Sequence, residues 1–272
     1  MPEKPEVMTV AKTLEKRIIN KEISGVDILW NKIIATDTHE FKDKIVGQKI
    51  TKITTRGKFI VIFLSDYALL IHLRMEGKFF FHKKGEKLLK HEHVIIRFTD
   101  GEEMRYHDTR KFGKMYLLPK SDVYKVAPLN KLGYEYYDKD LNKDYLLDKF
   151  KNIKKPIKET LLDQSIITGI GNIYANEILF KAHISPYRST NRINSTDADN
   201  IIKYTKETLD DAVKLGGTTI KSFTSSEGVH GLFQNELLVH GKKDQLCPIC
   251  GSVILKEKIG GRGTYYCPKC QK

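Results

Sequence analysis

Hydrophobic residues near the start of the chain recur at helical spacing. Val7, Val10, Leu14 and Ile18 follow one another at intervals of three and four, so they would lie on one face of a helix. Pro5 is compatible with the first helical turn, where its missing N–H costs nothing. This pattern predicts an amphipathic helix within Pro2–Ile23.

From Ile23 to Leu118 the pattern changes to short apolar runs separated by turns. The runs 58–64 and 67–73 are joined at Ser65-Asp66, and the runs 94–98 and 103–106 flank Asp100-Gly101. A dipeptide of the Asp-Gly type between two such runs is a hairpin signal. Strands at this spacing predict an antiparallel sandwich or barrel.

After Pro119 the chain is rich in Lys, Leu and Ile at helical spacing. Three stretches are helix-like: 138–150, 156–181 and 195–215. Thr168-Gly-Ile-Gly-Asn172 interrupts the second stretch and is too rich in glycine for a helix interior, so we expect two helices joined by a tight turn. Gly216-Gly217 ends the third stretch, and a loop at 222–231 follows it.

All four cysteines lie in the last part of the chain, as Cys247-Pro-Ile-Cys250 and Cys267-Pro-Lys-Cys270. Sixteen residues separate the two pairs, a spacing typical of a four-thiolate zinc site. A pair of disulfides is the alternative, which the absence of a signal peptide disfavours. Four protein ligands close the coordination sphere, so we expect one structural Zn²⁺ and chemistry elsewhere in the chain.

The charge balance narrows the class of partner. Lys and Arg number 47 against 34 Asp and Glu, which gives a net charge of +13 and a pI near 9.3. A surplus of this size favours a polyanion, either nucleic acid or an anionic membrane. No apolar run reaches the ~20 residues that span a bilayer, and the N-terminus lacks the pattern of a signal peptide. We therefore expect a cytosolic location.

The N-terminal tripeptide Met1-Pro2-Glu3 carries potential chemistry. Removal of Met1 would leave Pro2 with a secondary amine that can attack a sugar C1′ or an aldehyde to form an iminium. Glu3, beside it, could transfer protons. The alternative is that Pro2 and Pro5 only shape the start of the helix.

Two glycine-flanked segments could bind phosphate. The turn 169–172 would present backbone N–H groups at a helix N-terminus, with Lys154, Lys155 and Lys158 just upstream. Arg262 would lie at the tip of a hairpin formed by 259–264, where a projecting cation suits a phosphate. A plain helix–helix turn and a solvated hairpin are the corresponding alternatives.

Other candidates combine apolar and cationic side chains. Arg110 precedes Phe112, and Arg74 precedes Met75, pairs of the kind that proteins use to wedge open a base stack. Ordinary core packing would also explain Met75 and Phe112. Lys58 opens an apolar strand directly after Gly57 and could face a cleft, although most such lysines are simply solvated.

Taken in order, these segments resemble the bacterial formamidopyrimidine-DNA glycosylase family. The resemblance runs from the second residue to the last cysteine. It rests on these segments: 2–7, Arg56-Gly-Lys58, His72-Leu-Arg-Met-Glu-Gly77, Lys90-His-Glu-His93, Asp108-Thr-Arg-Lys-Phe-Gly113, 168–175, 216–219, 234–237 and Gly261-Arg-Gly-Thr264.

The resemblance implies an α+β multidomain fold. We expect an N-terminal helix on an antiparallel β-sandwich (residues 1–134), a helical domain with a helix–two-turn–helix motif (135–225), and a C-terminal zinc-finger β-hairpin (226–272). It also implies a partner, double-stranded DNA that contains a damaged purine, and a monomer that acts on the bacterial nucleoid in the cytoplasm, with no role for a membrane.

The resemblance further implies a bifunctional DNA glycosylase/AP lyase of base excision repair. Pro2 would be the nucleophile and Glu3 the proton donor. Lys58 would assist base release and β-elimination, and Arg262 would hold the phosphate during δ-elimination. The residues expected to contact DNA are His91, Arg110, Lys154 and Asn172, with Met75, Arg110 and Phe112 filling the space of the flipped nucleotide. The loop 222–231 would close over the extruded base.

Two positions depart from the family pattern. Lys4 stands where Leu is usual, and Thr109 where Pro is usual. Neither matches a catalytic position, but Lys4 lies next to the expected nucleophile, so we expect it to alter the basicity of that amine.

Three other functions are compatible with part of the sequence. One is the sister enzyme of the endonuclease VIII type, which prefers oxidised pyrimidines; Met75, Arg110 and Phe112 favour the purine enzyme. Another is a non-catalytic DNA-binding protein, which would not need Pro2 and Glu3. The last is a zinc-ribbon RNA-binding protein, which would leave the N-terminus unexplained.

Overall fold

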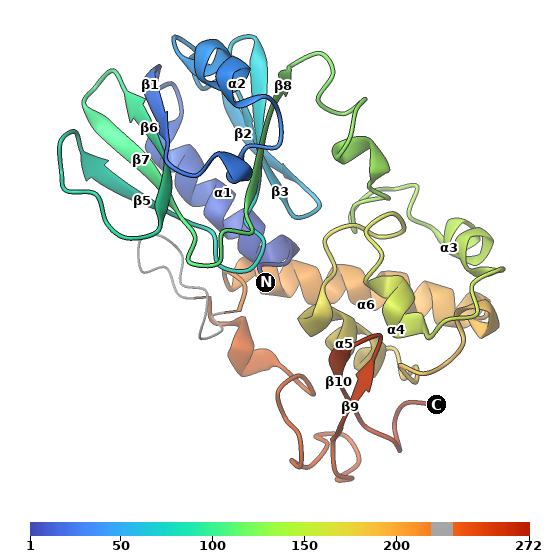
Figure 1. Ribbon diagram of the computed structural model, residues 1–272. Coiled ribbons are helices and arrows are strands. Elements are labelled where there is room, and N and C mark those ends of the chain that lie inside the picture. Colours follow the sequence, from blue (N-terminus) through green and yellow to red (C-terminus); the bar gives the residue numbers. More distant parts are fainter. Residues whose placement is uncertain (219–230) are drawn as a thin grey trace. The chain divides into compact units, whose positions relative to one another are not determined.

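The computed structural model describes residues 1–218 and 231–272 and divides into two compact units (Figure 1). Unit 1 comprises Met1–Asn130 and Gly216–Gly231, and unit 2 comprises Lys131–Leu215 and Leu232–Lys272. Among the described residues, no helix is long and apolar enough to cross a membrane. The domain limits expected at residues 134 and 225 stay predictions.

Unit 1 contains two four-stranded antiparallel sheets. The first has the order β1-β6-β7-β5, with β1 (Ile23–Ile28), β5 (Lys78–Lys83), β6 (Glu92–Phe98) and β7 (Glu102–His107). The second has the order β2-β3-β4-β8, with β2 (Lys52–Arg56), β3 (Phe59–Phe63), β4 (Tyr67–His72) and β8 (Lys114–Pro119). The predicted hairpin at Asp100-Gly101 joins β6 to β7, with Gly101 at a φ of +84°.

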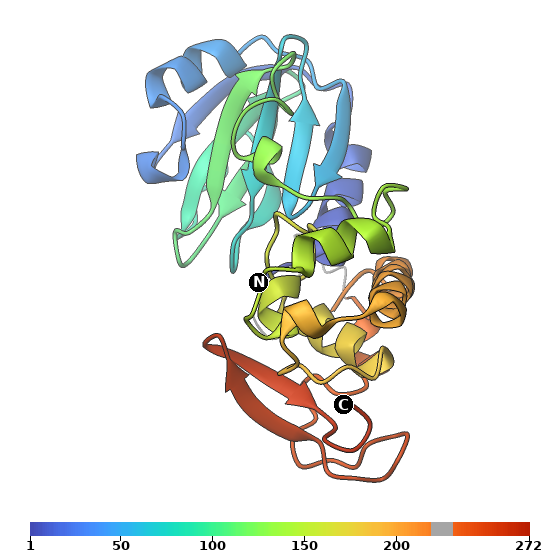
Figure 2. The same ribbon diagram turned by 90° about the vertical axis from the view of Figure 1, so that its right-hand side faces the viewer.

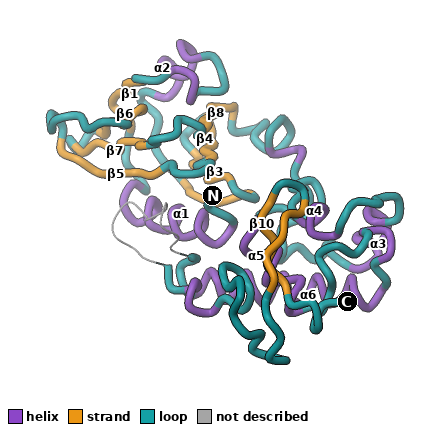
Figure 3. The backbone as a smooth tube through the Cα atoms, turned by 60° about the horizontal axis from the view of Figure 1, so that its bottom comes forward, coloured by secondary structure: helices purple, strands orange, loops and turns teal. Residues whose placement is uncertain are grey.

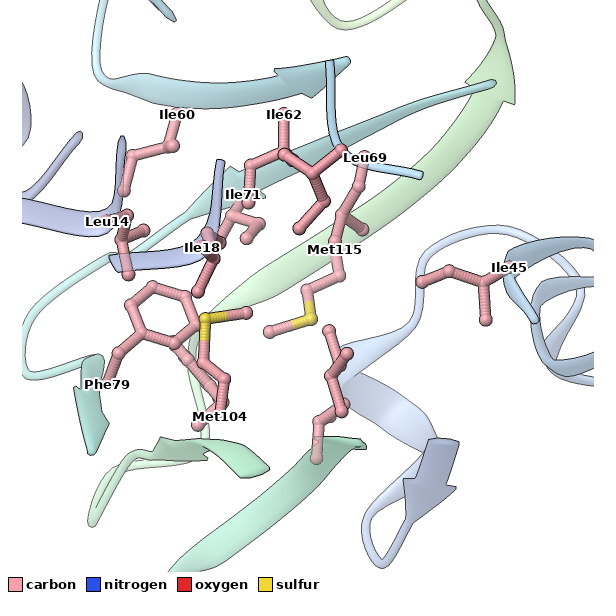
Figure 4. Packing of buried hydrophobic residues seen from close by; sticks show 14 of the residues in the cluster. Leu14, Ile18, Ile45, Ile60, Ile62, Leu69, Ile71, Phe79, Met104 and Met115 are labelled. Carbon is pink, nitrogen blue, oxygen red and sulfur yellow. The ribbon is translucent and has the colours of Figure 1, made fainter. Parts of the chain in front are cut away.

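One apolar core holds unit 1 together. Strand side chains alternate between faces, so each sheet turns one set inward. Figure 4 shows the result: Ile60 and Leu69 from one sheet lie with Phe79 and Met104 from the other, and Leu14 of α1 (Lys4–Ile18) joins them. The predicted N-terminal helix and β-sandwich are confirmed.

One element in unit 1 differs from the sequence expectation. Within the stretch interpreted as strands lies a helix, α2 (Thr38–Ile45). Asp37 caps it by accepting a hydrogen bond from the Glu40 N–H (2.8 Å), and Phe41 and Ile45, four residues apart, are buried on one face. The prediction was wrong here because two apolar residues are too few to reveal helical period.

Unit 2 begins with helices and ends with a hairpin. Its main elements are α3 (Lys143–Phe150), α4 (Ile157–Leu161), α5 (Asn172–Lys181), α6 (Ser195–Lys214), β9 (Leu255–Ile259) and β10 (Arg262–Tyr266). The predicted interruption between α4 and α5 is confirmed, with Gly169 at a φ of +96° and Gly171 at the N-cap of α5. The expected tight turn is wrong, because α4 ends at Leu161 and residues 162–171 separate the two helices. Figure 2 shows β9 and β10 as one two-stranded hairpin.

Candidate functional site

The N-terminal segment of unit 1 is buried and held by a carboxylate. Pro2 is buried, and Glu3 is 2% exposed at the N-cap of α1. Glu6 accepts the Glu3 N–H on Oε2 (2.8 Å) and the N–H and hydroxyl of Thr218 on Oε1 (2.7 and 3.0 Å). Pro5 occupies the first helical turn, so a helix-starting role is present too. That role does not explain why Pro2 and Glu3 are buried.

Lys4, the departure from the family pattern beside this segment, is also buried. Its side chain has no exposed surface, and its Nζ donates to Oγ1 of Thr55 on β2 (3.0 Å). The Lys4 amino group, two residues along the chain from Pro2, is therefore held in place. Thr109, the other departure, donates its hydroxyl to a carboxylate oxygen of Glu76.

Lys58 lies in the two-residue turn between β2 and β3. Gly57 precedes it at a φ of +53°, a conformation that favours glycine, and the register closes with Arg56 opposite Phe59. Lys58 is only 6% exposed, so it is not a solvated lysine at a strand end. A buried lysine in a tight turn has the rigidity that a catalytic amine needs.

His72 is a buried neighbour of this turn. It pairs with Phe59 across β3 and β4, and the two rings meet edge to face at 4.8 Å. Burial, together with the positive charges of Arg74 and Lys58, lowers the pKa of His72 to about 3. His72 is therefore neutral near pH 7. Its Nδ1 accepts the backbone N–H of Arg74 (3.0 Å), which fixes the turn before Met75.

Asp108 organises the turn that carries Arg110 and Phe112. This fully buried carboxylate accepts the backbone N–H of Arg110 on Oδ1 (3.0 Å) and that of Gly113 on Oδ2 (2.8 Å). Phe112 is 49% exposed, and the Arg110 guanidinium lies 4.8 Å from its ring centre. Core packing therefore does not account for Phe112. Met75, in contrast to Phe112, is half-buried.

His91 is half-buried in a loop with unusual backbone geometry. Its φ is +72°, which is uncommon for a residue other than glycine and persists where the surroundings fix the backbone. Its carbonyl accepts the Asp108 N–H (3.0 Å), and the next side chain, Glu92, accepts the Leu89 N–H (2.8 Å). The loop with His91 and the turn with Arg110 thus share Asp108.

In unit 2, the N-terminus of α5 lies beside the β9–β10 hairpin (Figure 3). The Asn172 side chain donates from Nδ2 to the carbonyl of Gly263 (3.0 Å). Arg262 is exposed at the first position of β10, directly after Gly260 and Gly261 at φ values of +53° and +72°. The two phosphate-binding segments expected from the sequence are therefore neighbours. Lys154 is exposed, and no described contact links its side chain to them.

The four cysteines gather at one point. Their sulfur atoms all lie within 4.8 Å of one another, with Cys247 and Cys270 at 3.8 Å and Cys250 and Cys267 at 3.4 Å. A tetrahedral Zn²⁺ with bonds of ~2.3 Å needs sulfur atoms roughly 3.8 Å apart, so the residues fit this metal. The cysteines are free, which excludes the disulfide alternative.

Several buried charges that shape the site were not predicted as such. Arg105 is 1% exposed and donates to Glu92, Glu103 and two carbonyls of the loop before His91. Lys158, expected near DNA, is instead fully buried. Their only sequence signal is a charge within an otherwise apolar pattern, because their partners are distant along the chain.

These features are typical of zinc-finger proteins that act on nucleic acid. They are a β-sandwich with a buried N-terminal segment, a glycine turn at a helix N-terminus and a hairpin with four cysteines. Three family models match this chain. They describe the formamidopyrimidine-DNA glycosylase N-terminal domain (residues 1–115), the H2TH domain of the same enzyme (132–224) and a zinc finger found in FPG and IleRS (244–272).

Full-length relatives agree with these matches. The formamidopyrimidine-DNA glycosylase of Oceanobacillus iheyensis is 44% identical, covering 100% of this chain and 98% of the relative. Lactococcus lactis Fpg in complex with DNA containing an abasic site superposes with a TM-score of 0.93 at 35% identity, over 99% of each chain. The same enzyme with DNA containing N7-benzyl-Fapy-dG gives 0.93 at 36% identity over 100% of each. The chain belongs to the formamidopyrimidine-DNA glycosylase family, and the predicted fold, family and structural zinc are confirmed.

Proposed function

We propose that this chain is a bifunctional DNA glycosylase/AP lyase of base excision repair. It removes oxidised purines, 8-oxoguanine and formamidopyrimidines, from double-stranded DNA and then cleaves the strand. The observation that carries this proposal is the burial of Pro2, Glu3 and Lys58 within a chain that matches the family over its whole length. A protein that only bound DNA would not need to bury this set.

The chemistry begins once Met1 is removed and Pro2 has a secondary amine. The amine nitrogen forms a bond to C1′ of the damaged nucleoside while the bond from C1′ to the base breaks. Glu3 moves the protons that this exchange requires, and Lys58 assists departure of the base. Loss of the amine proton and opening of the sugar ring leave an iminium between Pro2 and the abasic sugar.

Strand cleavage follows from the iminium, which makes the C2′ proton acidic. Its removal, assisted by Lys58, breaks the C3′–O3′ bond in β-elimination. A second elimination breaks the C5′–O5′ bond while Arg262 holds the phosphate. These steps need no metal, and the Zn²⁺ supplies structure to the hairpin that carries Arg262.

DNA binding must offset the cost of flipping the target nucleotide, which amounts to a few kcal/mol. The vacated space in the stack is filled by Arg110, Phe112 and Met75, and the exposure of Arg110 and Phe112 supports that role.

The phosphates are contacted by His91, Lys154, Asn172 and Arg262, and the net charge of +13 adds general affinity for DNA. The loop expected to cover the extruded base lies outside the described residues, except for Gly231.

The protein acts as a monomer in the bacterial cytoplasm, on nucleoid DNA. The zinc finger, the net positive charge and the DNA complexes of its structural relatives support this location and partner.

A nicking assay with matched duplexes tests the proposed function. Each duplex carries one 8-oxoguanine, one formamidopyrimidine, one thymine glycol or no lesion. The proposal expects strand cleavage of the two purine substrates and little of the others. Preferential cleavage at thymine glycol would assign the chain to the pyrimidine-specific enzyme, and tight binding without cleavage would make it a binding protein.

A further inference from the structure

A fully buried lysine of unit 2 contacts the hairpin that carries Arg262. Lys158 lies on α4, and its Nζ donates to the carbonyl of Gly263 (3.1 Å) and to Oγ1 of Thr264 (2.7 Å). A buried ammonium is strongly unfavourable unless hydrogen bonds replace its water. The position of Lys158 is therefore coupled tightly to the position of these two residues, which lie more than a hundred positions away in the sequence.

The same two residues determine the backbone on either side of Arg262. The Thr264 hydroxyl, which accepts from Lys158, donates to the carbonyl of Arg262 (3.1 Å). The Gly263 carbonyl accepts from Lys158 and also from Asn172 (3.0 Å). Both the carbonyl of Arg262 and the next one along the chain are thus held in place, and each hydrogen-bonded path leads to Lys158.

The tip of the hairpin also rests on α4. Gly260 lies so close to the side chain of Glu159 that an added Cβ would come within 2.7 Å of its carboxylate. Gly260 has a φ of +53°, so glycine is favoured here on two grounds. Figures 1 and 3 show α4, α5 and β10 side by side in different views.

We propose that Lys158 is a positioning residue that holds Arg262 and Asn172 on one phosphate. An arginine side chain is long and flexible, so its productive geometry depends on a fixed backbone beneath it. Lys158 provides that fixed point through Thr264 and Gly263. The inference rests on the proposed function, because it assumes that Arg262 binds the phosphate during δ-elimination.

Loss of Lys158 should affect the steps of the reaction unequally. Pro2, Glu3 and Lys58, which perform base release, belong to unit 1, whereas Lys158 acts on Arg262 in unit 2. Loss of Lys158 should therefore affect phosphate binding and the second elimination more than the covalent step at Pro2. A lysine with only a structural role would not separate these readouts.

The test compares four variants of the full-length zinc-loaded protein. Lys158→Met removes both hydrogen bonds with little change in volume, and Thr264→Val removes the hydroxyl. Thr264→Ser keeps the hydroxyl and is the conservative rescue. Lys151→Met removes an exposed lysine seven residues before Lys158 in the sequence and controls for the loss of one positive charge. Zinc content and thermal midpoint are measured for each variant.

Two quantities are read from each variant. One is the ratio of δ- to β-elimination product on an abasic duplex, and the other is the Kd for a duplex with a tetrahydrofuran abasic analogue. We expect Lys158→Met and Thr264→Val to lower the product ratio and to weaken binding about tenfold, with the salt dependence of binding reduced by about one phosphate contact. Thr264→Ser and Lys151→Met should match the unmodified protein.

Unchanged product ratio and Kd in Thr264→Val would overturn the proposal, as would equal losses in Lys151→Met. If Lys158→Met does not fold, the two Thr264 variants decide the question alone. Failure of the proposed function itself is seen separately, because the unmodified protein would then form no covalent adduct with DNA under borohydride.

Discussion

The residues expected to react in unit 1 and those expected to bind phosphate in unit 2 differ in their exposure to solvent. In unit 1, Pro2, Glu3 and Lys58 are buried, so water is kept from the groups expected to form and break bonds. In unit 2, Arg262 and Lys154 are exposed. Bond chemistry benefits from a rigid site of low dielectric constant, whereas a phosphate contact needs reach into solvent. The difference in exposure supports the proposed division, with bond chemistry in unit 1 and phosphate binding in unit 2.

The units also differ in what stabilises them. Unit 1 has a single large core between two sheets, with side chains such as Leu14 and Ile71 fully buried. Unit 2 has an apolar core of its own among its helices, but its hairpin adds only a small cluster around Val239, Ile254 and the cysteines. Small modules of this kind depend on their metal for folding. In both units, however, buried polar side chains hold the exposed ones: Asp108 in unit 1 and Lys158 in unit 2.

The largest expected effect comes from the buried groups of unit 1. Lys58→Met and Glu3→Gln should each lower the single-turnover rate of base release by ~10²–10⁴-fold, the range for a positioned acid or base. Lys52→Met, which removes an exposed lysine from the same hairpin, should change the rate less than twofold on the reasoning that exposed sites contribute little. Equal rates in Lys52→Met and Lys58→Met would contradict the assignment.

Removal of zinc should affect unit 2 selectively. Chelation, or the substitution Cys267→Ser at a fully buried ligand, should unfold the hairpin and weaken binding to abasic-analogue DNA by ~10²-fold, equivalent to ~3 kcal/mol. Titration by fluorescence anisotropy, with metal content from a colorimetric assay, measures both. Without zinc, unit 1 should still unfold at its original thermal midpoint. A lower midpoint for unit 1 would mean that the metal stabilises the whole chain.

The turn built on Asp108 should be the next most sensitive feature. Asp108→Asn leaves one oxygen where the turn needs two acceptors, so we expect a loss of ~1–3 kcal/mol in stability and a comparable loss of DNA affinity. Urea unfolding and binding titrations measure these. Asp43→Asn, at an exposed position, should change neither quantity; a similar loss in that variant would show that charge alone is responsible.

Acid should destabilise the protein through its buried neutral histidines. Burial lowers the pKa of His72 to about 3 and that of His240 to about 4, against 6.5 in the unfolded chain. The unfolded state therefore takes up protons first, and the stabilisation, complete above pH 6.5, is lost as the pH falls toward 3–4. Over this range, each histidine lowers the free energy of unfolding by up to ~1.4 kcal/mol for each pH unit of acidification.

Urea unfolding between pH 7 and pH 4 checks this prediction. The variant His72→Gln should lose less stability over the interval than the unmodified protein. His39→Gln, at an exposed position, should follow the unmodified curve. Parallel curves for all three proteins would contradict the account of His72.

The smallest expected effect concerns Lys4. When Lys4 is protonated, its buried charge disfavours a second positive charge at the Pro2 amine two residues away, so we expect Lys4→Leu to make that amine easier to protonate. The acidic limb of the pH–rate profile should then move to higher pH by roughly half a unit. Superimposable profiles for the two proteins would show that Lys4 has no influence on the nucleophile.

Much of the fold could be predicted because its signals are local. The spacing of Val7, Val10 and Leu14 indicates the first helix, Asp100-Gly101 a hairpin, and the cysteine pairs a metal site. Helix α2 escaped prediction because only Phe41 and Ile45 mark its buried face.

The buried polar side chains that hold the site could not be predicted. Lys158 and Thr264 are separated by 106 positions, and Arg105 and Glu92 by 13. No local pattern couples such residues, because they meet only when the chain folds. A charge within an apolar stretch indicates that a partner exists but does not identify it.

A borohydride trap decides whether Pro2 is the nucleophile. The protein, with loss of Met1 confirmed by intact mass, is mixed with a duplex holding one 8-oxoguanine opposite cytosine and then reduced. If Pro2 is the nucleophile, we expect a covalent protein–DNA adduct that peptide mapping assigns to Pro2. Tight binding without an adduct, or an adduct at a lysine such as Lys58, would contradict it.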